Sequence, residues 1–211
     1  MAAALKTLLP VAGIGGVGAV GGYYLLSDSS TIKDKLKEEL RGQPRRILSS
    51  DASAEWSEWK KVYKASSSKI SGVSSEEDLP KWCMDTLGQK FEQSKYALAK
   101  EWCVIDTSTL KGTLSLQGVN LIPESGDGID QKFKEAWKKV NSEKNSAGQL
   151  AISDDSVIGS SVSDENKGGS ELQKWCTSRY SWAMYKLEAR NDLEKVKKWC
   201  SEGAGVASQA Q

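Results

Sequence analysis

The chain has 211 residues, with 29 Lys plus Arg, 28 Asp plus Glu and no histidine. The balanced charge gives no reason to expect a nucleic-acid partner, and the absence of histidine removes the commonest general base and the commonest zinc ligand. Most triad hydrolases and metallohydrolases are therefore excluded, and we expect no metal or other cofactor.

An uncharged stretch follows Lys6. Residues 7–27 are 21 consecutive positions without a charged side chain. A helix of this length would extend about 30 Å, the thickness of the hydrocarbon layer of a bilayer. Tyr23 and Tyr24 lie near its end, where aromatic side chains favour the membrane interface. Residues 1–29 are therefore predicted to be a membrane anchor with one transmembrane helix, and the lipid bilayer is the first expected partner.

A cleavable signal peptide is the alternative to this anchor, because a short basic start precedes the apolar run. No clear cleavage site follows before Asp28, which favours the uncleaved anchor. The orientation in the membrane is ambiguous. Basic residues crowd the C-terminal side of the segment, and by their count the rest of the chain would lie inside the cell. They are Lys33, Lys35, Lys37, Arg41, Arg45 and Arg46.

Helical patterns follow the anchor. Residues 31–40 and a segment beginning near residue 53 each carry an apolar stripe at helical spacing, and either Asp51 or Ser53 can cap the second helix. Pro80 in a first turn predicts a third helix. The stripes are Ile32, Leu36 and Leu40 in the first helix, and Trp56, Trp59 and Tyr63 in the second. No long alternating pattern competes, so the predicted fold is all-α, although residues 114–122 could be extended.

Two parts of the sequence resemble each other, which indicates an internal duplication. Residues 31–36 match residues 109–114 at an offset of 78, and the sequence Trp-Lys-Lys-Val at 59–62 recurs at 137–140 with the same offset. We therefore predict two tandem helical units, residues 30–106 and 107–203, followed by a disordered tail at 204–211. The Ser-rich segments 66–77 and 142–170 are predicted to be flexible loops, and the second makes its unit longer.

Four cysteines form two pairs, Cys83 with Cys103 and Cys176 with Cys200. The spacings are too wide for a CxxC metal or redox motif. Helical hairpins with turns near residues 88–94 and 188–192 would bring each pair together, and each disulfide would then stabilise the fold by about 3 kcal/mol. The alternative is four reduced, buried cysteines. Disulfides require an oxidising compartment, which would place the region after the anchor outside the cell. This indication outweighs the count of Lys and Arg residues, which would place it inside.

Eight tryptophans accompany only two phenylalanines, so tryptophan is expected to fill the core. Each cysteine follows a tryptophan directly, and two further tryptophans lie in the repeated Trp-Lys-Lys-Val sequence. The structural tryptophans predicted in this way are Trp59, Trp82, Trp102, Trp137, Trp175 and Trp199.

Three features occur together after the anchor: a TIKDKL sequence at residues 31–36, a WKKVY sequence at residues 59–63, and Trp-Cys pairs around a helical segment. In these features, over nearly its whole length, the chain resembles the large paralogous sets of uncharacterised membrane-anchored proteins of haemotropic mycoplasmas. The resemblance implies a protein held in the single membrane of a wall-less bacterial parasite and displayed to the host. It implies no catalytic residue.

The leading functional hypothesis is a surface-displayed interaction or antigen protein whose loops meet a host or surface protein. A scaffold on the cytoplasmic side is the alternative, since the basic residues 33–46 could lie on anionic lipid. An enzyme is the remote alternative, and no catalytic residue is assigned. Its candidate carboxylates would be Asp127, Asp130, Asp154 and Asp155, which lie in loop-like sequence where acidic residues are simply soluble.

Overall fold

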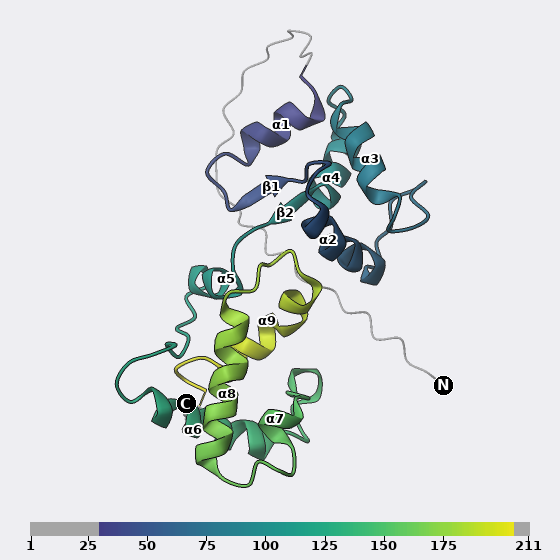
Figure 1. Ribbon diagram of the computed structural model, residues 1–211. Helices are drawn as coiled ribbons and strands as arrows, with labels where there is room; N and C mark the ends of the chain where they lie inside the picture. Colours follow the sequence, from purple (N-terminus) through teal and green to yellow (C-terminus); the bar gives the residue numbers. More distant parts are fainter. Residues whose placement is uncertain (1–29, 205–211) are drawn as a thin grey trace, which may run out of the picture.

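The computed structural model describes residues 30–204, so the predicted anchor at 7–27 and the tail at 205–211 lie outside the described residues (Figure 1). Within residues 30–204, no helix has the length and apolar character needed to cross a membrane. The elements are α1 (Ile32–Glu39), β1 (Arg45–Ile47), α2 (Ser53–Ala65), α3 (Leu79–Leu87), α4 (Gln93–Trp102), β2 (Val104–Asp106), α5 (Leu110–Leu116), α6 (Ile129–Glu143), η1 (Gly148–Leu150), α7 (Asp155–Ile158), α8 (Glu165–Tyr180) and α9 (Leu187–Trp199).

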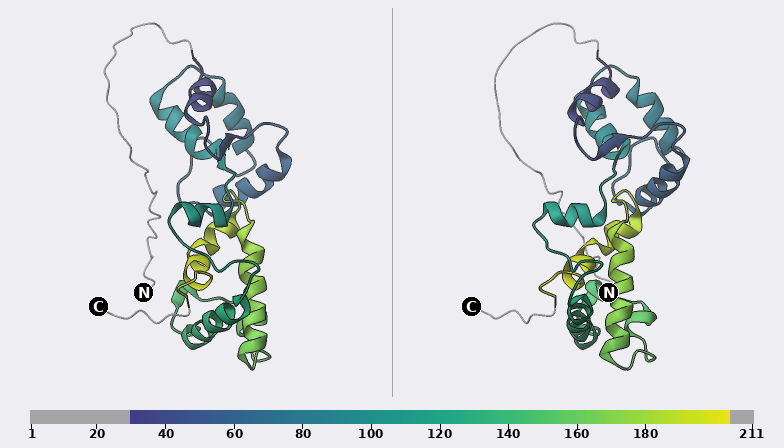
Figure 2. Two further views of the ribbon diagram at one scale, coloured as in Figure 1. Left: turned by 90° about the vertical axis from the view of Figure 1, so that its left-hand side faces the viewer. Right: turned by 60° about the vertical axis from the view of Figure 1, so that its left-hand side comes forward.

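These elements form two lobes, one after the other along the chain (Figures 1 and 2). The N-terminal lobe contains α1 to α4 and both strands around one apolar core, and the C-terminal lobe contains α5 to α9 around another. The described chain is therefore mostly helical, as predicted. The two cores divide the chain close to residue 107.

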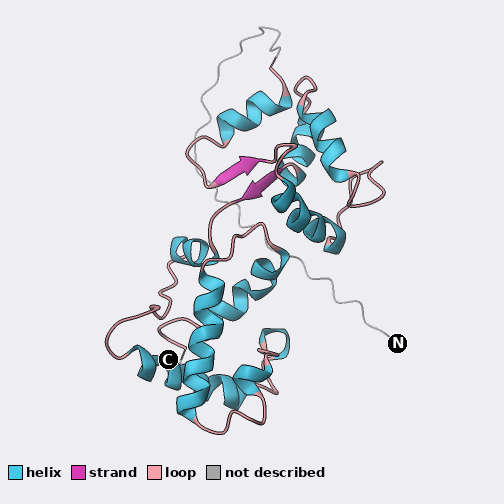
Figure 3. Ribbon diagram, viewed as in Figure 1, coloured by secondary structure: helices cyan, strands magenta, loops and turns pink. Residues whose placement is uncertain are grey.

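A small sheet in the N-terminal lobe was not predicted (Figure 3). Strands β1 and β2 are antiparallel, with Arg45 opposite Asp106 and Ile47 opposite Val104. Each strand has only three residues, too few to show the alternation of apolar and polar positions that identifies a strand in sequence. The sheet closes the N-terminal lobe by joining the segment after α1 to the segment after α4.

Local signals explain where several helices begin. The Thr31 hydroxyl accepts a hydrogen bond from Asp34 N, and the Asp34 carboxylate accepts one from Thr31 N, which forms a capping box for α1. Asp164 caps α8 by accepting hydrogen bonds from Asn166 N and Lys167 N. Helix α2 begins at Ser53 after Ala52 and has no side-chain cap, so the predicted capping by Asp51 or Ser53 is wrong.

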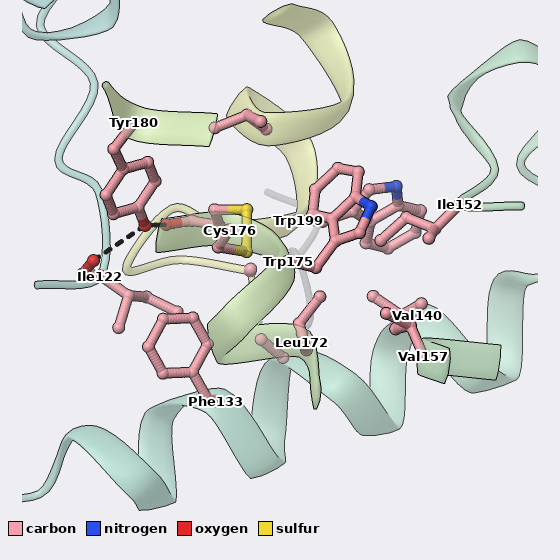
Figure 4. Packing of buried hydrophobic residues seen from close by; sticks show 14 of the residues in the cluster. Ile122, Phe133, Val140, Ile152, Val157, Leu172, Trp175, Cys176, Tyr180 and Trp199 are labelled. Atoms are coloured by element: carbon pink, nitrogen blue, oxygen red, sulfur yellow. Dashed lines mark hydrogen bonds between the residues drawn. A yellow bond between two sulfur atoms is a disulfide. The ribbon is translucent and has the colours of Figure 1, made fainter. Parts of the chain in front are cut away.

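The C-terminal lobe is built on the long contact between α6 and α8 (Figure 4). Gly168 and Gly169 lie on the face of α8 that meets α6, and they allow the two helices to approach closely. Beyond them, Phe133, Leu172 and Tyr180 continue the core, and the Tyr180 hydroxyl donates a hydrogen bond to Ile122 O over 2.9 Å. The two helices thus form the frame against which the remaining segments of the lobe pack.

Matching backbone hydrogen bonds occur in the two lobes. In each lobe, the first helix (α1 or α5) begins beside the turn of the disulfide-linked hairpin (α3–α4 or α8–α9). The segment after the first helix donates a second hydrogen bond to the cysteine that follows the hairpin's second helix. The four bonds run from Ile32 N to Gln89 O (2.9 Å), Leu110 N to Trp182 O (2.8 Å), Leu48 N to Cys103 O (2.9 Å) and Ile122 N to Cys200 O (2.7 Å).

Several local predictions were wrong. Residues 110–116 form α5, so residues 114–122 are not one extended segment. The turn of the second hairpin lies at residues 181–186, because α9 already begins at Leu187. Ala204, assigned to a disordered tail, is buried in the C-terminal core.

The two Ser-rich segments are more ordered than predicted. Residues 142–170 contain η1, α7 and the first turns of α8, and Ile152 and Val157 from this segment are buried. Residues 66–77 bury Ile70 and Val73 against the N-terminal core. These few apolar side chains fix both segments in place despite their polar composition.

Candidate functional site

Both predicted disulfides are present. Cys83 on α3 is bonded to Cys103 at the end of α4, and Cys176 on α8 is bonded to Cys200 at the end of α9. The Cα atoms lie 5.5 and 5.8 Å apart, and all four cysteines are fully buried. Each bond joins the two helices of one hairpin inside the core of its lobe. In this arrangement the sulfurs serve as cross-links and offer no thiol for catalysis.

The predicted structural tryptophans lie in or against the two cores. Trp59, Trp102, Trp137, Trp175 and Trp199 are buried, and Trp82 packs against the N-terminal core while keeping part of its surface exposed. The indole groups of three of them also donate hydrogen bonds to backbone carbonyl groups. The donors and acceptors are Trp59 Nε1 and Trp102 O (2.8 Å), Trp137 Nε1 and Val157 O (2.7 Å), and Trp199 Nε1 and Leu150 O (2.6 Å).

The candidate carboxylates do not form a site. Asp154 caps α7 by accepting a hydrogen bond from Ser156 N, and hydrogen bonding from Ser156 holds the pKa of Asp154 below its ordinary value. Asp127 precedes α6, and Asp130 lies in its first turn. Within residues 30–204, no group of three or more Cys, Asp or Glu side chains is placed to hold a metal ion.

A groove of about 500 Å³ runs along α2 and is lined by lysines and glutamates. The lysines could attract an anion, but each is paired: Lys60 with Glu77, Lys64 with Glu76 at 2.7 Å, and Lys61 with Glu58 at 2.9 Å. These pairs neutralise the groove. It therefore lacks the excess positive charge expected of a phosphate or nucleic-acid site.

A second cleft, of about 480 Å³, lies between α1 and the turn before α4. The Tyr96 hydroxyl donates a hydrogen bond to the Glu39 carboxylate, which also pairs with Lys100. Lys100 and Tyr96 together hold the pKa of Glu39 below its ordinary value. Burial, together with Glu39, raises the pKa of Tyr96 to about 12. The Phe91 ring packs against Tyr96 with centroids 5.3 Å apart and remains 41% exposed.

The contact between the lobes uses residues that no sequence motif indicated. Tyr185, in the turn before α9, and Leu187, the first residue of α9, pack against the N-terminal core. The Arg190 guanidinium lies over the Trp59 ring at 4.8 Å, and Arg190 Nε donates a hydrogen bond to Met184 O over 3.0 Å.

Comparison with known proteins identifies no relative. No family model, curated protein or solved structure matches the chain.

The described surface thus offers cross-linked lobes, one neutral groove and one partly apolar cleft. The strongest pKa changes in the cleft come from a Tyr–Glu–Lys cluster that links α1 to α4.

Proposed function

We propose that this chain is a membrane-anchored, surface-displayed interaction or antigen protein without catalytic activity. In this proposal residues 7–27 span the bilayer, and residues 30–106 and 107–203 are two copies of one helical unit held on the outer side. The proposal includes membership of the paralogous membrane-anchored proteins of haemotropic mycoplasmas, on the sequence features given above.

The observation that carries the proposal is the pair of buried disulfides. Disulfides persist in oxidising compartments and are rare in the cytosol. An uncharged run of 21 residues, positions 7–27, followed by cross-linked lobes fits an exported and anchored protein. The same disulfides argue against the cytoplasmic scaffold, although basic residues follow the anchor.

The duplication is supported by sequence and hydrogen bonds together. Residues that match in sequence at an offset of 78 begin α1 and α5, and both helices start beside the turn of their lobe's hairpin. Each hairpin then carries one disulfide at equivalent places. Two units of one design would give the protein two similar surfaces on one anchor.

We infer that the two Ser-rich segments are the parts presented to a host or surface protein. In residues 66–77, Ile70 and Val73 are buried while Ser67, Ser68 and Ser71 are exposed. Exposed polar positions of this kind accept substitutions at little cost in stability, and the buried positions keep the segment in place.

The test uses Leu116→Cys in the full chain, expressed in bacterial protoplasts. Leu116 lies on α5 and is 83% exposed, so the new thiol is accessible and the core is untouched. A membrane-impermeant maleimide should label this variant on intact protoplasts. The native chain is the matched control, because its four cysteines are bonded and buried and should remain unlabelled before and after lysis.

Two results would contradict the proposal. Labelling of Leu116→Cys only after lysis would place the lobes inside and support the cytoplasmic scaffold. Recovery of the chain in the fraction without membranes would contradict the proposal that residues 7–27 anchor it in a bilayer.

A further inference from the structure

The turn between α3 and α4 presents an exposed aromatic side chain at a particular place. Phe91, 41% exposed, lies where the described chain begins, because Phe91 N donates a hydrogen bond to Ser30 O over 3.2 Å. Thr31 also pairs with Lys90 in the same turn. The turn therefore holds the segment through which the N-terminal lobe is joined to residues 7–27.

The distance from this turn to the end of the uncharged segment is short. Two residues lie between position 27 and Ser30, and an extended chain covers at most about 3.5 Å per residue, so these three steps can span at most about 10 Å. The headgroup region on each side of the hydrocarbon layer is roughly 5–8 Å thick. If residues 7–27 span a bilayer, Phe91 can reach the headgroup region.

The corresponding turn of the C-terminal lobe, between α8 and α9, is covered by another part of the chain. Met184 N donates a hydrogen bond to Ser108 O over 2.9 Å, in the position of the bond from Phe91 to Ser30. There the turn is covered, since Met184 is 8% exposed and its neighbours Tyr185 and Leu187 pack against the N-terminal lobe. This turn thus packs against the part of the chain that directly precedes its lobe.

The Phe91 turn has the equivalent position in the N-terminal lobe, beside Ser30, the first described residue. We propose that the Phe91 turn is a membrane-contact site that lies in the lipid headgroup region beside the anchor. This inference rests on the proposed function, because it requires residues 7–27 to lie in a bilayer. Lys90 and Lys33 are exposed at the same end and supply positive charge for lipid phosphates. The N-terminal lobe is then seated on the membrane by the anchor and by this turn.

The test is a fluorescence measurement on the full chain in phosphatidylcholine vesicles. Phe91→Cys carries the environment-sensitive label NBD, and Leu116→Cys with the same label is the matched control, being 83% exposed on the other lobe. Lipids with a nitroxide on the headgroup are included in both leaflets. We expect a blue shift and a loss of fluorescence for the label at 91, and neither change for the label at 116.

Each other result overturns the inference. Vesicle flotation distinguishes a failure of the membrane-contact inference from a failure of the proposed function. A chain that does not float with the vesicles refutes both the inference and the proposed function. A chain that floats with an unquenched label at 91 refutes the membrane contact alone, and a blue shift without quenching would show that protein covers the turn. Lys90→Cys is the second labelling position, used if alkylation shows that Phe91→Cys has disturbed the disulfides.

Discussion

Trp137 and Gly168 illustrate how single residues fix the C-terminal lobe. The indole of Trp137 is buried and tied to Val157 O, and it lies directly against the backbone of Gly168 on α8. A Cβ atom added at Gly168 would lie 2.1 Å from Trp137 Cε2, far inside van der Waals contact. The absence of a side chain at Gly168 therefore sets how closely α6 and α8 can pack.

Gly168→Ala should lower the free energy of unfolding by about 3 kcal/mol, because the methyl group overpacks against a fixed ring. Helix propensity alone predicts the opposite sign, a gain of up to about 1 kcal/mol. Urea unfolding followed by circular dichroism measures the change. Gly88→Ala is the control: a Cβ there meets no atom closer than 3.9 Å, and the variant should be neutral or slightly stabilised. Equal midpoints for the two variants would contradict the packing argument.

The Glu39 cluster gives a prediction about pH. Because Lys100 and Tyr96 lower the pKa of Glu39 in the folded state, the cluster stabilises the fold above the unfolded pKa of about 4.3. That contribution is lost as the pH falls through the lower folded value. The Glu39 side chain is 35% exposed, so solvent screening limits the contribution to about 1 kcal/mol or less.

Glu39→Gln should therefore be less stable than the native chain at pH 7 and nearly equal to it at a pH low enough to protonate the native carboxyl. Chemical unfolding across this pH range provides the comparison. Glu101→Gln removes an exposed carboxylate from α4 and serves as the control. A constant difference between Glu39→Gln and the native chain at every pH would show that the loss is one of packing rather than charge.

At the scale of elements, the hairpins α3–α4 and α8–α9 depend on their cross-links. Each lobe has a small core, and a disulfide between the two helices of its hairpin restricts the unfolded chain. The closed segments span 20 and 24 residues, for which chain entropy gives about 3 kcal/mol each. The segment that each disulfide closes lies entirely within one lobe. Each disulfide is therefore expected to stabilise its own lobe.

Replacing Cys176 and Cys200 together by alanine should destabilise the C-terminal lobe by about 3 kcal/mol or somewhat more, since the buried sulfurs are also lost from the core. Hydrogen exchange resolved by segment checks this, with faster exchange expected first in α8 and α9. The pair Cys83→Ala and Cys103→Ala is the matched variant, in which α3 and α4 should respond first. A uniform response of both lobes to either pair would contradict this assignment.

The same elements show what sequence could predict. Apolar stripes located α1 and α2, and Pro80 located α3, because those signals are local. The cysteine pairing followed from the helical hairpins. The order within residues 142–170 was missed because Ile152, Val157 and Val162 are scattered among polar residues and become core only through contacts with distant helices. For the same reason no local pattern indicated Arg190 or Leu187 as contact residues.

For the whole molecule, the decisive contact is that between the lobes. The turn before α9 belongs to the C-terminal lobe, yet Tyr185 and Leu187 cover apolar surface of the N-terminal core, and Arg190 lies over Trp59. Arg190 is exposed, and a cation–π contact at an exposed site contributes about 0.5–1 kcal/mol; the partial burial of Leu187 adds about 1–2 kcal/mol. These contacts should make the N-terminal lobe more stable in the full chain than its own core alone would.

Leu187→Asp tests this coupling, because it places a charge in the apolar contact while aspartate at the first position of α9 suits the helix N-terminus. We expect faster hydrogen exchange in α2 of the other lobe, by about five- to thirtyfold for a loss of 1–2 kcal/mol, with α9 itself little changed. Leu116→Asp, on the exposed face of α5, should leave α2 unaffected. Faster exchange confined to α9 would mean that the lobes are stabilised separately and that the contact between them contributes nothing to the stability of the N-terminal lobe.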